Sequence, residues 1–243
     1  MIVQACINGA RDATFHPALP LTPDAMARDS AACVAAGAAE VHLHARSPDG
    51  RESLSPTTMD ATVNAVRHAC PGTLIGVSTG AWIERDEKRT LASIDGWREL
   101  PDYASVNLSE PDAPTVIERL RRRGVGVEAG LASVADAERL IALNIGALAL
   151  RMLIEVSEQD VGEALAVAEG IEQALNRGGV RRPMLVHGCD ATVWRFVTLA
   201  AGRRWSTRVG LEDGKTLPSG ETAADNAAIV AAAAAVFRTQ DRP

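Results

Sequence analysis

Short apolar runs alternate with helix-like segments along the whole chain, and this alternation limits the possible folds more than any other feature. Strand-like runs, eight in number, lie near residues 2–7, 40–45, 73–77, 103–107, 125–129, 146–154, 183–187 and 206–210. Segments with apolar residues at helical spacing lie near 23–36, 57–69, 87–98, 113–122, 133–142, 158–177, 191–201 and 222–238. A strand followed by a helix, repeated eight times, predicts an α/β fold in which residues 1–243 form a single (β/α)8 domain, the TIM barrel. The main alternative is an open, doubly wound sheet.

Several helix boundaries carry signals of their own. Thr22 and Ser133 stand just before helix-like segments, where a side-chain oxygen can accept a hydrogen bond from a free backbone N–H. Gly37, Gly124 and Gly146 fall where helices should end and the chain should turn toward the next strand. These signals support the boundaries that the periodicity predicts.

The composition argues against several classes of protein. Lys and Arg number 25 against 31 Asp and Glu, and a net charge of −6 disfavours nucleic-acid binding. No apolar run reaches the roughly 18 to 20 residues that span a bilayer, so we expect no membrane partner. No basic region precedes the first apolar run, and the cysteines are widely separated, so we expect a cytoplasmic protein with reduced thiols. The cysteines are Cys6, Cys33, Cys70 and Cys189.

Two histidines at the end of the second predicted strand form the first candidate site. The functional residues of a barrel lie at the C-terminal ends of its strands. His42 and His44 are two residues apart, so their side chains share one face of the strand and can reach a single ion. Neutral imidazoles suit Zn²⁺. The alternative is that one or both histidines only make hydrogen bonds inside the barrel.

Two adjacent carboxylates after the eighth predicted strand form the second candidate site. Glu212 and Asp213 follow Arg208, and they can serve as a metal ligand beside a general base. The alternative is a solvated turn. After the third strand, Ser78 and Thr79 offer hydroxyl groups beside a glycine.

Other polar side chains follow the remaining strands, each more often solvated than catalytic when considered alone. They are Asn107, Glu110, Glu128, Glu155 and His187. The chain contains no glycine-rich dinucleotide motif, P-loop, nucleophile elbow or HExxH helix.

Several of these segments together resemble the β-keto acid cleavage enzyme family. The resemblance rests on residues 8–10 (NGA), 42–46 (HLHAR), 78–80 (STG) and 208–213 (RVGLED), and it runs from the first strand to the last helix. It implies a zinc-dependent barrel in which a β-keto acid reacts with the acetyl carbon of acetyl-CoA, giving acetoacetate and a new acyl-CoA. Acetyl-CoA would be the co-substrate, and a homo-oligomer is expected.

The resemblance also implies roles for individual residues. One zinc ion per chain would be held by His42, His44 and Glu212. Asp213 would be the general base, Arg208 its charged partner, and Ser78 a group that assists acyl transfer. We expect four further residues to bind substrate: Thr79, Asn107, Glu128 and Arg46.

The chain differs from the family pattern in two places. Arg11 stands where the family's lysine-fermentation enzyme carries an acidic residue, and the Gly- and Pro-rich loop expected after the sixth strand is missing. These differences indicate a compact branch with a different substrate. Two other functions stay open at this point: a zinc hydrolase of the barrel amidohydrolase type, and a non-catalytic barrel that binds a keto acid.

Overall fold

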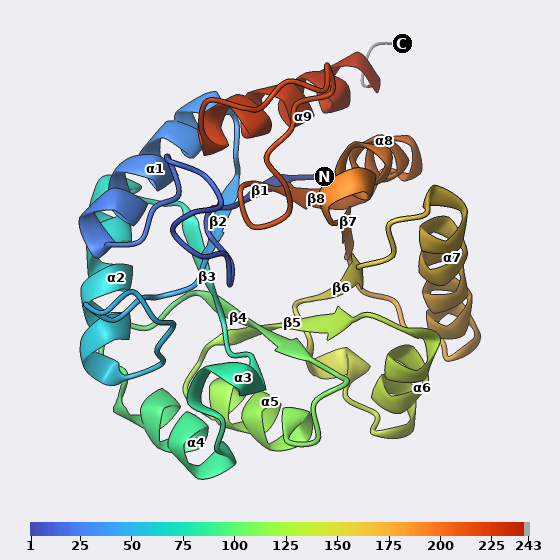
Figure 1. Ribbon diagram of the computed structural model, residues 1–243. Coiled ribbons are helices and arrows are strands. Elements are labelled where there is room, and N and C mark those ends of the chain that lie inside the picture. The colour runs from blue at the N-terminus through green and yellow to red at the C-terminus, as the bar shows by residue number, and fades with distance from the viewer. Residues whose placement is uncertain (241–243) are drawn as a thin grey trace.

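The computed structural model describes residues 1–240, in which eight parallel strands pair in chain order and the last strand returns to the first (Figure 1). The strands are β1 (Val3–Cys6), β2 (Glu40–Leu43), β3 (Leu74–Ser78), β4 (Tyr103–Asn107), β5 (Gly126–Leu131), β6 (Arg151–Val156), β7 (Met184–Gly188) and β8 (Ser206–Val209). The α-helices are α1 (Pro23–Ala36), α2 (Pro56–Ala69), α3 (Ala81–Glu84), α4 (Glu87–Gly96), α5 (Ala113–Arg122), α6 (Val134–Ala142), α7 (Val161–Arg177), α8 (Val193–Arg203) and α9 (Asn226–Gln240). The prediction of a closed α/β barrel is confirmed.

The helix signals mostly act as expected. The side chains of Thr22 and Ser133 accept hydrogen bonds from the third residue beyond them, each at 3.2 Å, and so cap α1 and α6. Gly37 and Gly124 adopt the left-handed backbone that ends a helix. Gly146 instead opens a short 3₁₀ helix, Gly146–Leu148.

Two details of the fold differ from the sequence-based expectation. The sixth strand begins at Arg151, not at residue 146, because the alternating Ala and Leu residues before it are not in the sheet. Leu148 and Leu150 are exposed, so this alternation does not reflect a buried strand face. The short helix α3 was not expected; it follows β3 and carries Trp82.

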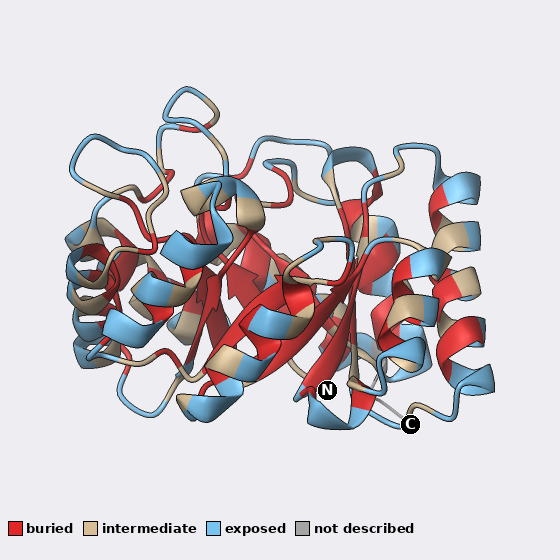
Figure 2. Cartoon of the chain, turned by 90° about the horizontal axis from the view of Figure 1, so that it is seen from below, coloured by how far each residue is buried: buried red, intermediate tan, exposed pale blue. Residues whose placement is uncertain are grey.

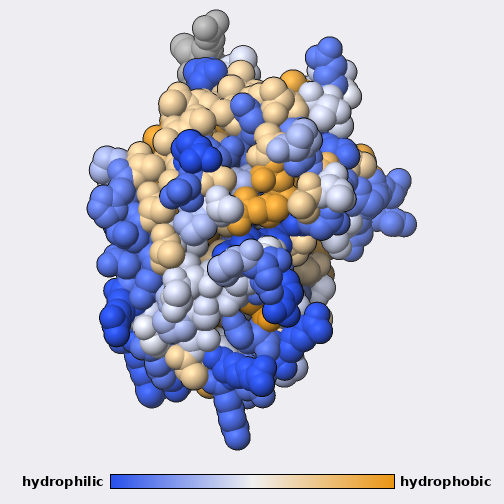
Figure 3. All heavy atoms as spheres, turned by 60° about the vertical axis from the view of Figure 1, so that its left-hand side comes forward, coloured by the Kyte–Doolittle hydropathy of each residue, from blue (hydrophilic) through white to orange (hydrophobic). Residues whose placement is uncertain are grey.

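The strands are buried inside a ring of helices that expose their outer faces (Figure 2). On the face seen in Figure 3, hydrophilic side chains predominate and the more apolar ones gather toward the top of the view. Within residues 1–240, no helix is both long and apolar enough to cross a membrane. All four cysteines are free thiols.

A buried ion-pair network fills the lower part of the barrel, below the functional end. The Arg151 guanidinium pairs with Glu40 and, through Nε, with Glu128 Oε1 at 2.6 Å. Gln4 Nε2 donates to Glu128 Oε1 at 3.2 Å and to the Tyr103 hydroxyl at 2.8 Å. These side chains are at most 10% exposed, so the network replaces the apolar layer that is common at this depth of a barrel.

We expect Arg151→Met to lower the free energy of unfolding by about 3–5 kcal/mol, because it leaves two buried carboxylates without their cation. Urea unfolding followed by circular dichroism measures this loss. The matched control is Arg122→Met, since Arg122 pairs with Glu118 on the surface of α5 and such pairs contribute about 0.3–0.5 kcal/mol. Equal losses in the two variants would contradict the expectation.

Candidate active site

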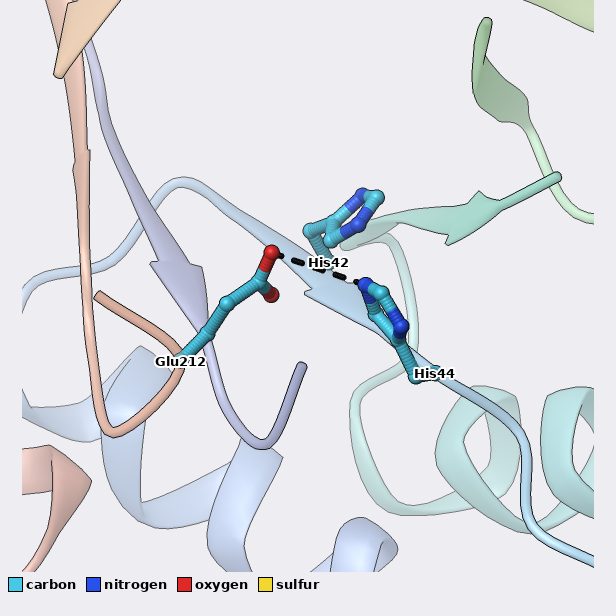
Figure 4. Close-up of side chains that lie close together, drawn as sticks. All are labelled: His42, His44 and Glu212. Carbon is cyan, nitrogen blue, oxygen red and sulfur yellow. Dashed lines mark ion pairs between the residues drawn. The ribbon is translucent and has the colours of Figure 1, made fainter. Parts of the chain in front are cut away.

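Closure of the barrel brings together two histidines and a carboxylate that are far apart in the sequence. His42 lies on β2 and His44 directly follows this strand, so both side chains face the barrel interior. Glu212 enters from the loop after β8 and points toward both rings (Figure 4). Its Oε1 atom lies 3.5 Å from His44 Nε2, and one ligand atom from each of the three side chains lies within 4.8 Å of the others. The structure therefore brings the three expected metal ligands to one place.

The loop after β1 supports both halves of this cluster. Asn8 Oδ1 accepts a hydrogen bond from the backbone N–H of His44, and Asn8 Nδ2 donates to the His44 carbonyl, both at 2.9 Å. Gly9 adopts a left-handed φ of +54°, and a Cβ atom there would lie 2.4 Å from Glu212 Cγ. Asn8 thus fixes the backbone of one ligand, while Gly9 leaves the space that another ligand occupies.

Asn226, at the start of α9, holds the loop that carries Glu212 and Asp213 against the end of β1. Asn226 Oδ1 accepts from the backbone N–H of Leu211 at 2.7 Å, and Asn226 Nδ2 donates to the Ile7 carbonyl at 2.8 Å. Gly210 packs so closely on β1 that a Cβ atom would lie 1.9 Å from the Cys6 carbonyl oxygen. The sequence analysis did not identify Asn226, because its partners lie far away along the chain.

The donor groups of this cluster fit a divalent ion. Burial lowers the pKa of His42 to about 3, so its imidazole is neutral and keeps a lone pair. Burial also lowers the pKa of His44, but the Glu212 and Glu52 carboxylates outweigh it and raise this pKa to about 9, which shows that the surroundings favour a cation. Glu212 Oε2 is buried and has no hydrogen-bond partner within residues 1–240. Two imidazoles and one carboxylate match the ligands of catalytic zinc sites.

Asp213 lies beside the cluster with its carboxylate almost fully buried, at 1% exposure. Its Oδ2 atom has no partner in the described part of the chain, so it can accept a proton from a bound molecule. His187 Nδ1 lies 3.0 Å from Asp213 Oδ1, and His187 Nε2 lies 3.1 Å from Glu155 Oε2. Although burial opposes it, the His187 hydrogen bond and the Arg208 charge lower the pKa of Glu155 to about 2.

Arg208 is the central cation of this region and contacts several carboxylates. Its Nη2 atom lies 2.6 Å from Glu212 Oε1, 3.3 Å from Glu155 Oε2 and 3.6 Å from Asp213 Oδ1. Asp213, the expected partner of Arg208, is therefore the most distant of the three carboxylates. The shorter partner of Asp213 is His187, which the sequence analysis noted at the end of its strand without assigning it to the site.

The cluster lines a cavity of about 360 Å³ at the C-terminal ends of the strands. Ser78 and Asn107 line this cavity, as expected for residues near substrate. Arg11, Trp82 and Cys189 also line it and were not among the expected site residues.

The three other residues expected to bind substrate lie outside the lining of this cavity. Thr79 follows Ser78 and so points the other way, where its hydroxyl donates to the Ser105 carbonyl at 2.8 Å. The Arg46 guanidinium donates to the carbonyls of Gly9 and Arg11, and Arg46 lines a neighbouring groove.

Glu128 belongs to the network below the site. The expected strand ended at residue 129, which placed Glu128 near its upper end, but β5 continues to Leu131. Glu128 is therefore three residues below the end of the strand and pairs with Arg151. Its position does not support a role in substrate binding.

Comparison with known proteins decides the family. The sequence profile of the β-keto acid cleavage enzymes matches residues 1–243. The chain belongs to the β-keto acid cleavage enzyme family. A 3-oxoadipate:acetyl-CoA acetyltransferase of Cupriavidus necator is 28% identical over 268 aligned positions, which cover all of this chain and 90% of that protein.

Two further relatives match over shorter segments. The 3-keto-5-aminohexanoate cleavage enzymes of Acetoanaerobium sticklandii and Fusobacterium nucleatum are 32% and 36% identical over 39% and 33% of this chain. These alignments span only 35% and 30% of the length of those two family members.

Among solved structures, a ternary complex of ObcA with a C4-CoA adduct and oxalate superposes with a TM-score of 0.76 at 18% identity, over 92% of this chain and 64% of that one. A 3-hexulose-6-phosphate synthase of Salmonella typhimurium superposes with a TM-score of 0.56 at 14% identity, over 99% and 100% of the two chains. At these low identities, the superpositions show that the two structures have the same barrel fold as this chain.

Proposed function

We propose that this chain is a zinc-dependent β-keto acid cleavage enzyme that uses acetyl-CoA as co-substrate and forms acetoacetate and a new acyl-CoA. The observation that carries the proposal is the convergence of His42, His44 and Glu212 in one cavity beside the Asp213 carboxylate, whose Oδ2 atom has no partner within residues 1–240. Membership of the family supports the reaction class. The full-length relative from Cupriavidus necator, whose name specifies an acetyl-CoA acetyltransferase, supports the thioester.

His42, His44 and Glu212 would hold the ion, and three protein ligands leave a position open for an oxygen of the β-keto acid. The bound ion would supply Lewis acidity that stabilises negative charge developing on this oxygen. Arg208 offsets part of the negative charge of the carboxylates gathered around it, which reduces the repulsion of an anionic substrate.

Asp213 is the proposed base. It removes a proton from the carbon between the keto and carboxylate groups, and this carbon then bonds to the acetyl carbonyl carbon as the thioester C–S bond breaks. The released CoA sulfur bonds to the former keto carbon as the original carbon–carbon bond breaks, and Asp213 returns the proton to acetoacetate. His187 Nδ1 lies 3.0 Å from Asp213 Oδ1 and orients this carboxylate. The rate enhancement from a general base depends on such positioning.

Other residues of the cavity bind and orient. Ser78 and Asn107 present a hydroxyl and an amide from neighbouring strands, and these groups suit the oxygens of a carboxylate or thioester. Arg11, in the loop after β1, also lines the cavity. Its Nε atom donates to the Glu212 carbonyl at 3.0 Å, and its Nη2 atom lies 2.9 Å from Asp190 Oδ1. A cation at this place favours a substrate whose variable end is neutral or anionic. Residence in the cytoplasm and assembly into a homo-oligomer remain predictions from the sequence.

The test of the proposal is a panel of β-keto acids, incubated with zinc-loaded protein in the presence and absence of acetyl-CoA. We expect acetoacetate and the matching acyl-CoA only when the thioester is present, and loss of both after the metal is removed with a chelator. Chromatography of the CoA thioesters and an acetoacetate assay measure the two products. Turnover without the thioester would favour the zinc hydrolase, and metal binding without any turnover would favour the keto-acid-binding barrel.

Two neighbouring substitutions separate the ligand from the base. Asp213→Asn keeps the shape but removes the basicity, so we expect it to retain zinc and to lose on the order of 10² or more in turnover. Glu212→Gln should instead weaken zinc binding. Metal analysis after dialysis and steady-state kinetics measure the two effects. Loss of zinc in Asp213→Asn with full retention in Glu212→Gln would reverse the assignment.

A further inference from the structure

Glu52 uses both of its carboxylate oxygens on the outer side of His44. Its Oε1 atom lies 2.5 Å from His44 Nδ1, and its Oε2 atom accepts a hydrogen bond from Trp82 Nε1 at 3.0 Å. The Glu52 side chain is 12% exposed although it lies on a surface loop. Sequence patterns do not connect Glu52 with the site, because Glu52 lies outside the motif that contains the histidines.

The backbone around Glu52 is held as firmly as its side chain. Glu52 forms an antiparallel bridge with Arg46, and the next residue, Ser53, donates its N–H to the Ala45 carbonyl at 3.0 Å. The Trp82 ring stacks on the His44 ring, with centroids 6.4 Å apart and planes inclined by 25°. The His44 imidazole is therefore bonded at Nδ1 and covered on one side, while its Nε2 atom faces Glu212.

We propose that Glu52 is a positioning residue that keeps a hydrogen on His44 Nδ1 and so presents the Nε2 lone pair to the metal, with Trp82 holding Glu52 in place. A carboxylate bonded to the outer nitrogen of a ligating histidine fixes the orientation of the ring and strengthens it as a ligand. The inference rests on the proposed metal site, but it concerns affinity for the ion and not the reaction.

The test measures the zinc dissociation constant by competition with a chromogenic chelator. We expect Glu52→Ala to raise this constant by about 10- to 100-fold, the range typical of lost outer partners of metal ligands. Trp82→Phe, which removes the hydrogen bond to Glu52 but keeps an aromatic ring beside His44, should have a smaller effect in the same direction. Asp49→Asn is the matched control, because Asp49 lies in the same loop and bonds only Ser47 and Arg51.

An unchanged constant in Glu52→Ala would overturn the inference, and so would an equal change in Asp49→Asn, which would indicate a general effect of charge. If wild-type protein fails to bind zinc, the proposed function fails with it. Since no turnover is measured, an inactive but zinc-binding wild type leaves this inference intact.

A different observation concerns the groove on the other side of Trp82. This groove has a volume of about 840 Å³ and runs between the loop of residues 47–53 and the segment of residues 82–89. Trp82 lines both this groove and the catalytic cavity, so the two spaces meet at its ring. A molecule that occupies both spaces would have to pass the Trp82 ring.

The charges that face the groove are not balanced. The acidic residues are engaged: Glu52 as described above, Asp49 with Arg51, and Glu84 with the backbone N–H of Leu54 at 2.8 Å. Two exposed arginines lack an acidic partner within residues 1–240. The Arg85 Nε atom donates to the Trp82 carbonyl at 3.4 Å, and the Arg89 guanidinium makes no ion pair or hydrogen bond there. Exposed guanidinium groups without an acidic partner can bind phosphate oxygens.

We infer that this groove binds the phosphate groups of the CoA thioester, with the pantetheine arm passing Trp82 into the catalytic cavity. The inference rests on the proposed function, because that reaction supplies the thioester. It predicts that Arg85 and Arg89 contribute to binding of the phosphate groups and not to binding of the acyl group.

The test compares acetyl-CoA with acetyl-pantetheine, which carries the same thioester without phosphates. In the double variant Arg85→Gln/Arg89→Gln we expect the KM for acetyl-CoA to rise about tenfold, which corresponds to about 1.4 kcal/mol, while that for acetyl-pantetheine stays the same. The control is Arg121→Gln/Arg122→Gln on α5. An equal rise for both thioesters, or no rise, would overturn the inference. Calorimetric binding of CoA that weakens in the double variant without any turnover would support the groove while refuting the proposed reaction.

Discussion

The pairing of β8 with β1 is the contact on which the rest of the structure depends. Val3, Gln4 and Ala5 pair with Thr207, Arg208 and Val209, and this pairing joins the two ends of the sheet. His42 and His44, at the end of β2, and the carboxylates after β8 lie on either side of β1, so they meet only when the barrel closes. Gly9 and Gly210 make the approach possible, since a side chain at either position would occupy space that the neighbouring segment fills.

The barrel interior is polar at two levels that do different things. The lower level is a set of little-exposed ion pairs around Arg151, in which Glu128 Oε2 lacks a hydrogen-bond partner but lies outside the lining of the cavity. The upper level leaves Glu212 Oε2 and Asp213 Oδ2 without hydrogen-bond partners within residues 1–240, and both residues line the cavity. Buried polar atoms normally have partners, so unsatisfied atoms of residues that line a cavity indicate where a ligand binds. The contrast between the two levels distinguishes scaffold from site without reference to any relative.

The sequence predicts the architecture well because each βα unit carries its own periodicity and caps. Thr22 and Ser133 act locally, and the spacing of His42 and His44 fixes their common face whatever the tertiary structure. Strand register explains why two of the predicted substrate-binding residues lie outside the lining of the cavity. Glu128 was expected at the mouth because the strand was expected to end at residue 129, and an extension to Leu131 lowers it into the ion-pair network. Thr79 shows the same sensitivity, since adjacent strand residues point in opposite directions.

The remaining unpredicted features depend on contacts between distant segments. Glu52 reaches His44 because residues 46–53 fold back on themselves, and His187 reaches Asp213 only when β7 and β8 lie together. No local pattern distinguishes these residues from ordinary polar side chains after a strand. Their contacts with His44 and Asp213 identify them, and these contacts are visible only in the three-dimensional structure.

The long separation along the chain between the two halves of the site has a consequence for how the protein matures. Contacts between residues about 170 positions apart form late, because closing so large a loop costs entropy that only the finished barrel offsets. A growing chain that has exposed His42 and His44 still lacks Glu212, so an ion at the proposed metal site would have only two ligands at that stage and would exchange readily. Tight retention at this proposed site would require the last strand to join the sheet, so that metal loading would depend on completed folding.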